Sequence, residues 1–265
     1  MIEIFSLAFI QRAAVAGILI GFVTSYYGVF IVQRKLSFLG SGLAHSAFGG
    51  AALGILLETE PLWVALPFTI IISILIVYLK EKSKLSGDTS IGILFSLSVA
   101  LGIIFLSLKK GYTSDAFTYL FGSILSVQKI DLLFSLLLAL LSVATFFSQW
   151  KKWAYATFDA ELAQADRVSV VKDDYLLSIL ISVTIVVSIK VVGIVLLTAF
   201  LVIPAASSRL ISSTFYQMTI YSIIIGVLSS FIGLIASIQM DLPTGAVIIL
   251  IQTVFFIVAL ILSKK

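Results

Sequence analysis

Long apolar runs separated by short polar breaks occupy most of the chain, and this pattern predicts the fold class. Each run is roughly 16–22 residues long, which is about the length that an α-helix needs to cross a bilayer. The expected spans are residues 13–32, 40–57, 62–79, 90–108, 131–148, 175–189, 191–206, 218–238 and 245–262. We therefore expect an all-α, polytopic helical membrane protein with eight or nine transmembrane helices in a single domain over residues 1–265.

One apolar run is too short to be a span. Residues 116–127, "AFTYLFGSILSV", rise only about 1.5 Å per residue as a helix and fall short of about 30 Å of hydrocarbon. Such a segment is tolerated only where protein or a water-filled cavity satisfies its ends. We expect a short re-entrant or interfacial helix here.

Composition and charge support a membrane location. The chain is 60% apolar and 11% charged, whereas soluble domains carry about 25% charged residues. The net charge of +4 does not indicate nucleic-acid binding, because the Lys and Arg residues lie at span ends, where they set orientation. Most of them fall on the cytoplasmic side if the polar interval 149–174 is cytoplasmic, and the C-terminus then lies on the same side.

The one histidine of the chain, His45, is the first candidate for chemistry. Helical spacing places it on one face with Ser41 and Gly49, several residues into the second span. Ionisable residues inside a membrane mark ion pathways, and a neutral imidazole is a good ligand for zinc, iron or manganese. The alternative is a histidine that bonds a backbone carbonyl or a serine between packed helices. A single histidine cannot complete a metal site, so any site would be transient or shared across a symmetric dimer.

The polar interval 149–174 is the second candidate. We expect it to contain a short charged amphipathic helix with Asp159 as its N-cap. The apolar stripe of this helix is expected to be Leu162, Ala165 and Val168, with Asp159, Glu161, Asp166 and Arg167 exposed. Such a helix suits docking to a soluble partner, although the same pattern fits a solvated linker.

Proline and glycine residues suggest where helices bend or pack closely. Pro204 has no N–H and is expected to disrupt the helix near its cytoplasmic end, as a hinge or as a structural kink. Gly193, Gly49 and Gly50 are further candidates for hinge or packing positions.

Several catalytic motifs are absent from the sequence. It contains no glycine-rich phosphate-binding loop, no HExxH, no GxSxG and no paired carboxylates inside the spans. These absences argue against ATP binding by such a loop, a membrane protease, an esterase and a proton-coupled carrier. We do not expect an enzyme.

Six segments, taken in order, resemble the permease subunits of the manganese/zinc/iron uptake family of ABC transporters. They are "FIQRA", "YYGVFIVQRKLSFLGSGLAHSAFGG", "GDTSIGILFSLSVALG", "YLFGSILSV", "VGIVLLTAFLVIPAASSRL" and "DLPTGAVIIL". The resemblance implies a fold similar to cobalamin and siderophore importers, in which a permease homodimer encloses the pathway. It also implies cytoplasmic ATP-binding-cassette ATPases as partners, an extracytoplasmic metal-binding protein, and a location in the prokaryotic plasma membrane. The cargo is then a divalent metal ion, and no cofactor is bound by the chain itself.

The resemblance also implies roles for particular residues. Residues 157–168 match the family's coupling helix, which assigns ATPase contacts to Asp159, Glu161, Leu162, Ala163, Ala165 and Asp166. His45 falls at the family's pathway histidine, but Ser41 stands where many members carry Asp, so the pair is a weaker metal site. The alternatives are a self-contained cation channel or secondary carrier, and an ABC permease for a metal chelate.

Overall fold

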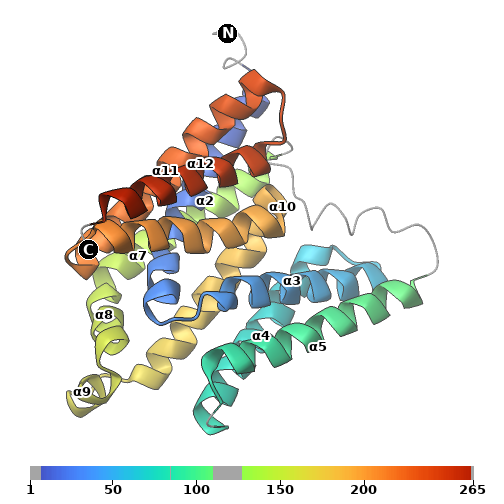
Figure 1. Cartoon of the computed structure of the whole chain (residues 1–265). Coiled ribbons are helices and arrows are strands. Elements are labelled where there is room, and N and C mark those ends of the chain that lie inside the picture. The colour runs from blue at the N-terminus through green and yellow to red at the C-terminus, as the bar shows by residue number, and fades with distance from the viewer. Residues whose placement is uncertain (1–6, 84, 110–126, 264–265) are drawn as a thin grey trace.

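The computed structural model describes residues 7–83, 85–109 and 127–263, and every regular element in these residues is a helix (Figure 1). The helices are α2 (Ala8–Gln33), α3 (Phe38–Leu56), α4 (Pro61–Lys82), α5 (Gly87–Leu108), α7 (Lys129–Ser148), α8 (Trp150–Phe158), α9 (Ala160–Ala165), α10 (Val170–Ile211), α11 (Phe215–Met240) and α12 (Thr244–Leu262). Eight of these described helices are long and apolar enough to cross a membrane, in agreement with the expected architecture. The re-entrant helix expected at residues 116–127 lies outside the described residues, apart from Val127.

Polar caps rather than apolar content set several helix ends. α5 begins before its apolar run because the Ser86 hydroxyl accepts the Thr89 N–H at 3.1 Å. α7 begins at Lys129, where Gln128 and Asp131 form a capping box. Such contacts satisfy backbone N–H groups that the first helical turn leaves without partners. The expected spans were therefore too short at these ends.

Helix α10 differs most from its prediction. We expected two spans separated at Lys190, but the helix continues past Lys190 and its only non-helical position is Gly193, at φ 75° and ψ 167°. This conformation suits glycine, which has no Cβ to clash. The 42 residues of α10 would extend about 63 Å if straight, twice the hydrocarbon thickness. The bend instead makes two arms, residues 170–192 and 194–211, which diverge in Figure 1.

Pro204 does not disrupt α10 as expected. It is buried, and the helix continues beyond it to Ile211. Membrane helices tolerate proline where neighbouring groups satisfy the freed backbone carbonyl. The bend in this region therefore belongs to Gly193 and not to Pro204.

Glycines allow α3 to approach its neighbours closely. A Cβ atom on Gly49 would lie 2.6 Å from the Ser98 carbonyl oxygen of α5, and one on Gly50 would lie 2.7 Å from Cα of Ala65 in α4. No side chain fits at such distances without movement of the backbone. These two positions fix α3, and hence His45, against α4 and α5.

Replacing Gly50 with alanine is expected to lower the free energy of unfolding by about 1–3 kcal/mol, because the new methyl group overpacks the α3–α4 contact. Gly92→Ala in α5 is the matched control, since a Cβ there meets nothing within 4 Å. Thermal unfolding of the purified Gly50→Ala and Gly92→Ala variants in detergent measures the stability of each. Equal midpoints for the two variants would show that the α3–α4 approach is looser than described.

Candidate functional site

The His45 ring is held in one orientation by two contacts. Its Nδ1 lies 2.9 Å from the backbone oxygen of Ser41, one helical turn earlier. A carbonyl only accepts hydrogen bonds, so Nδ1 carries the proton and donates it, which leaves the lone pair of a neutral imidazole on Nε2. The ring also meets Phe95 of α5 edge to face, with centroids 4.9 Å apart. The carbonyl bond that we considered as an alternative is thus present, yet it uses only one of the two nitrogens.

The side of α3 that carries His45 is partly exposed in the single chain. Ser41, His45 and Phe48 are half-buried, whereas Leu43 and Ala44 between them are buried. Gly49, which we expected on this face, is buried against α5 instead. A half-exposed imidazole in the middle of an apolar span is costly against lipid, because hydrocarbon offers it no polar partner.

A complete metal site is absent from the part of the chain that the structure describes. No group of three or more His, Cys, Asp or Glu side chains lies close enough together there to hold an ion. His45 can therefore supply one ligand, and the remaining ligands would come from backbone, hydroxyl groups, water or a second molecule.

The interval 149–174 folds into two short helices, α8 and α9, and the start of α10. The Asp159 carboxylate accepts the Leu162 N–H at 2.9 Å, which confirms the predicted N-cap of α9. The predicted apolar stripe is wrong: Leu162 is 52% exposed and Ala165 is exposed, whereas Ala163 is fully buried.

The short length of α9 explains this difference. The helix ends at Ala165, and Arg167 adopts a left-handed conformation with φ 62°. This conformation brings the Val168 N–H to within 2.9 Å of the Ala163 carbonyl oxygen, a closing turn typical of helix ends. Val168 therefore lies outside the helical repeat, and Ala163 packs with Ala156 and Val170.

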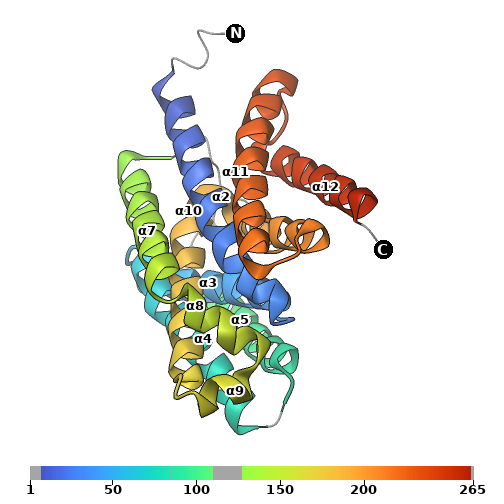
Figure 2. The same cartoon turned by 90° about the vertical axis from the view of Figure 1, so that its left-hand side faces the viewer.

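The outer surface of α9 combines acidic and apolar side chains. Of the six residues proposed for ATPase contacts, Ala163 is turned inward, and the exposed ones are Asp159, Glu161, Leu162, Ala165 and Asp166. Figures 1 and 2 show α9 at the end of the bundle opposite the start of α2. An exposed leucine among carboxylates at the tip of the molecule is suited to a protein contact.

A hydrogen bond fixes the angle between α8 and the turn after α9. The Tyr155 hydroxyl donates to the Asp166 carboxylate at 2.6 Å. This bond, more than desolvation or the nearby negative charges, raises the pKa of Tyr155 to about 12. Tyr155 therefore stays protonated, and remains a donor, throughout the neutral pH range.

Aromatic side chains attach α8 to two spans. Trp153 is fully buried and meets Phe30 of α2 edge to face at 5.6 Å, while Trp150 stacks on Phe215, the first residue of α11, at 5.6 Å. Phe158 also meets Phe215, at 5.3 Å. This cluster was not predicted from the sequence, where the charged residues of the interval were the candidates for function. The three-residue spacing of Trp150 and Trp153 on one helix face was the available signal.

An ion pair joins the bend in α10 to the start of α7. Lys190 Nζ lies 3.1 Å from Asp131 Oδ1, and the other oxygen of Asp131 accepts the Gln128 N–H at 2.9 Å. Lys190 is thus an interior residue of α10, three residues before Gly193, whose charge is paired with Asp131 of α7, and it does not separate two spans.

The described residues form a bundle of apolar helices with a small polar helix projecting from one end, which is the architecture of a polytopic membrane protein. The sequence profile of the ABC 3 transport family matches residues 6–263, and the chain belongs to this family. It is therefore a multi-pass protein of the cell membrane, as the apolar runs and the resemblance predicted.

Similar proteins cover nearly the full length of the chain. The high-affinity zinc uptake system membrane protein ZnuB of Haemophilus influenzae is 33% identical over 253 residues, which cover 96% of this chain and 97% of ZnuB. The manganese import system permease protein ScaB of Streptococcus gordonii is 35% identical over 260 residues, covering 97% and 92%. The solved structure of PsaBC from Streptococcus pneumoniae in complex with Fab contains a chain with a TM-score of 0.86 and 30% identity, with 100% of this chain and 97% of that chain covered.

Proposed function

We propose that this chain is the permease subunit of an ATP-driven importer for a divalent transition metal ion, with zinc and manganese as the first candidates and iron as the third. The supporting observation is the match along nearly the whole chain to membrane proteins named for zinc uptake and manganese import. A cytoplasmic ATP-binding-cassette ATPase hydrolyses ATP, and an extracytoplasmic binding protein delivers the ion.

The permease works as a homodimer with His45 on the pathway. Two arguments support this arrangement: the half-buried His45 face has an imidazole Nε2 available, and a single chain offers one such ligand. Two copies facing each other would shield the imidazoles from lipid and place two Nε2 atoms along one pathway. Ser41 replaces the Asp that many family members carry, so the site has one anionic ligand fewer and binds a cation less strongly. His45 therefore guides a passing ion and does not hold it tightly.

The exposed surface of α9 docks on the ATPase. Glu161 and Leu162 are at its centre, and both are exposed. The Asp159 cap and the Tyr155–Asp166 bond keep the segment rigid, so that a displacement of the ATPase moves it as one unit.

Uptake into vesicles that contain this permease, its ATPase and its binding protein tests the proposal and identifies the cargo. Zinc, manganese and ferrous iron are each supplied in labelled form, with ATP on the cytoplasmic side. We expect uptake of one of the three labelled ions, blocked by an excess of the same ion in unlabelled form. Uptake restricted to a metal chelate would contradict a free divalent ion as cargo.

A further inference from the structure

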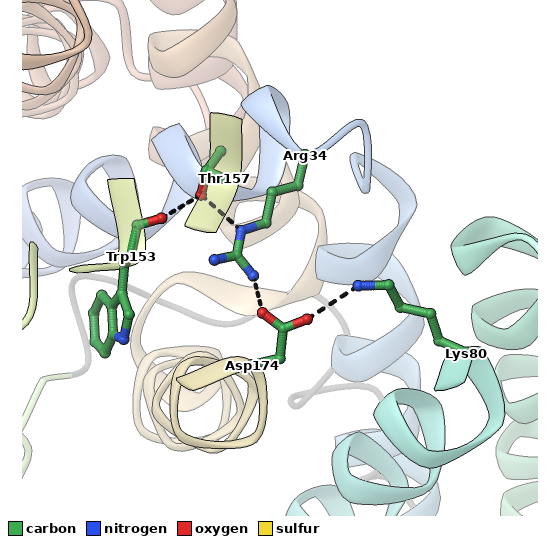
Figure 3. Close-up of polar contacts among 5 residues, drawn as sticks. All are labelled: Arg34, Lys80, Trp153, Thr157 and Asp174. Atoms are coloured by element: carbon green, nitrogen blue, oxygen red, sulfur yellow. Dashed lines mark hydrogen bonds and ion pairs between the residues drawn. The ribbon is translucent and has the colours of Figure 1, made fainter. Parts of the chain in front are cut away.

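Arg34 connects four helices at the end of the bundle that carries α8 (Figure 3). Its Nε donates to the Thr157 hydroxyl of α8 at 2.9 Å, and its Nη1 pairs with the Asp174 carboxylate of α10. The second oxygen of Asp174 lies 3.1 Å from Lys80 Nζ at the end of α4. α2, α8, α10 and α4 are thus linked through one guanidinium group and one carboxylate.

The backbone at the end of α2 fixes the position of Arg34. Arg34 is the C-cap residue, Lys35 is left-handed at φ 58°, and the Leu36 N–H bonds the Ile31 carbonyl at 2.9 Å. These bonds close the helix by a defined turn and leave little freedom at its last residue. The guanidinium then reaches two partners at once, which the single amine of a lysine cannot do in the same geometry.

The Thr157 hydroxyl is the point at which α8 joins this network. It accepts from Arg34 and donates to the Trp153 carbonyl at 2.6 Å, so its one O–H donor is used and its position is fixed from two sides (Figure 3). Thr157 lies in the last turn of α8, two residues before the Asp159 cap of α9. A displacement of α9 acts directly on the start of α10, because Ala163 packs on Val170, and it acts through Thr157 on Arg34 at the end of α2.

The network borders a small cavity and contains one donor atom that no described residue pairs. A cavity of about 40 Å³ lies beside it, lined by Arg34, Lys80, Asp174 and apolar side chains of α2, α4 and α10. The Nη2 atom of Arg34 is buried without a hydrogen-bond partner among the described residues. The Arg34 and Asp174 side chains are each only 12% exposed, so solvent screens their attraction less than that of a surface pair.

The aromatic cluster and the network both attach α8 to α2, and each adds further spans. Trp150 and Trp153 hold it to α2 and α11, whereas Thr157 connects it through Arg34 to α10 and α4. The first arm of α10 continues from Asp174 to the Gly193 bend at the opposite end of the bundle. A rigid arm of this kind can carry a tilt from one end to the other.

We propose that Arg34 is a positioning residue that transmits displacement of the α8–α9 segment to α10 and α4 through Thr157 and Asp174. The proposal rests on the proposed function, because it requires α9 to follow the ATPase. Arg34 holds no metal and does not touch the ATPase; it determines how far movement of the ATPase is converted into movement of the spans.

The test compares Thr157→Val, which keeps the side-chain shape and removes the hydroxyl, with Thr157→Ser, which keeps the hydroxyl. Metal uptake and ATP hydrolysis are measured in the same vesicles containing permease, ATPase and binding protein. We expect Thr157→Val to transport about fivefold less metal per ATP, from loss of one charge-assisted hydrogen bond, and Thr157→Ser to stay within about twofold of the unmodified complex. The amount of ATPase that co-purifies should be the same for all three.

Arg34→Lys is a second variant, which keeps a positive charge near Asp174 but cannot span both partners; it should match Thr157→Val. An unchanged ratio of metal to ATP in both variants would overturn the proposal. Loss of ATPase co-purification in Thr157→Val would also overturn it, because the network would then govern docking and not transmission. Failure of the unmodified complex to couple ATP hydrolysis to metal uptake would instead refute the proposed function.

Discussion

Replacing His45 with alanine is expected to reduce metal uptake by at least about tenfold, because the pathway loses an imidazole ligand and loss of one supporting group alone costs metal sites about 10–100-fold. The geometry places the available nitrogen, Nε2, on the half-buried face of α3, while Nδ1 is occupied by the Ser41 carbonyl. The measurement is the initial rate of labelled zinc or manganese uptake into vesicles containing the complete transporter. Co-purification of the ATPase should be unaffected, since α3 has no part in the α9 surface.

His45→Gln separates the two interpretations of this residue. Glutamine can still donate a hydrogen bond to the Ser41 carbonyl, but it is a poor ligand for zinc or manganese. If His45 guides the ion, His45→Gln is as defective as His45→Ala. Near-normal uptake by His45→Gln would show that the residue serves only helix packing.

Reversing the charge of Glu161 together with Leu162→Asp is expected to weaken ATPase docking by more than about tenfold. The Glu161→Lys/Leu162→Asp variant replaces the exposed centre of α9 with side chains of the wrong charge and polarity, and Leu162 is 52% exposed and available to a partner. Loss of a central apolar anchor and a charge pair weakens a protein interface by more than about tenfold. The measurement is the fraction of ATPase retained on the purified permease in detergent.

The control for this experiment is Lys82→Glu, a charge reversal at an exposed position at the end of α4. It changes the charge of the same end of the bundle and leaves α9 intact, so ATPase retention should be normal. Equal retention by the double variant and by Lys82→Glu would refute the assignment of α9 as the docking surface.

The sequence predicted the features of this protein that depend on local rules. Apolar runs located the membrane helices because a segment inside hydrocarbon has to satisfy its backbone hydrogen bonds internally, as an α-helix does. The Asp159 cap was predicted because its hydrogen bond joins residues only three positions apart, Asp159 and Leu162, and so depends on the local sequence alone. The one histidine was found because the sequence contains no other.

Features that depend on tertiary contacts were missed. Two separate spans divided at Lys190 were expected, since a charge inside an apolar run suggests a break, but Asp131 of another helix pairs with that amine and the bend lies at Gly193. The inward side of α9 was assigned wrongly because a helix of six residues has too few turns for a repeat to define a face. The Arg34–Asp174 pair joins residues 140 positions apart, and a single sequence contains no information about such pairing.

The central claim is that the chain moves a divalent metal ion only when ATP is hydrolysed by its partner. The most direct measurement is labelled zinc or manganese uptake into vesicles that contain the permease and binding protein, with and without the ATPase. We expect uptake that requires both the ATPase and ATP and that accumulates the ion against its gradient. Equal flux without the ATPase, running only down the gradient, would contradict the account and identify a self-contained channel or carrier.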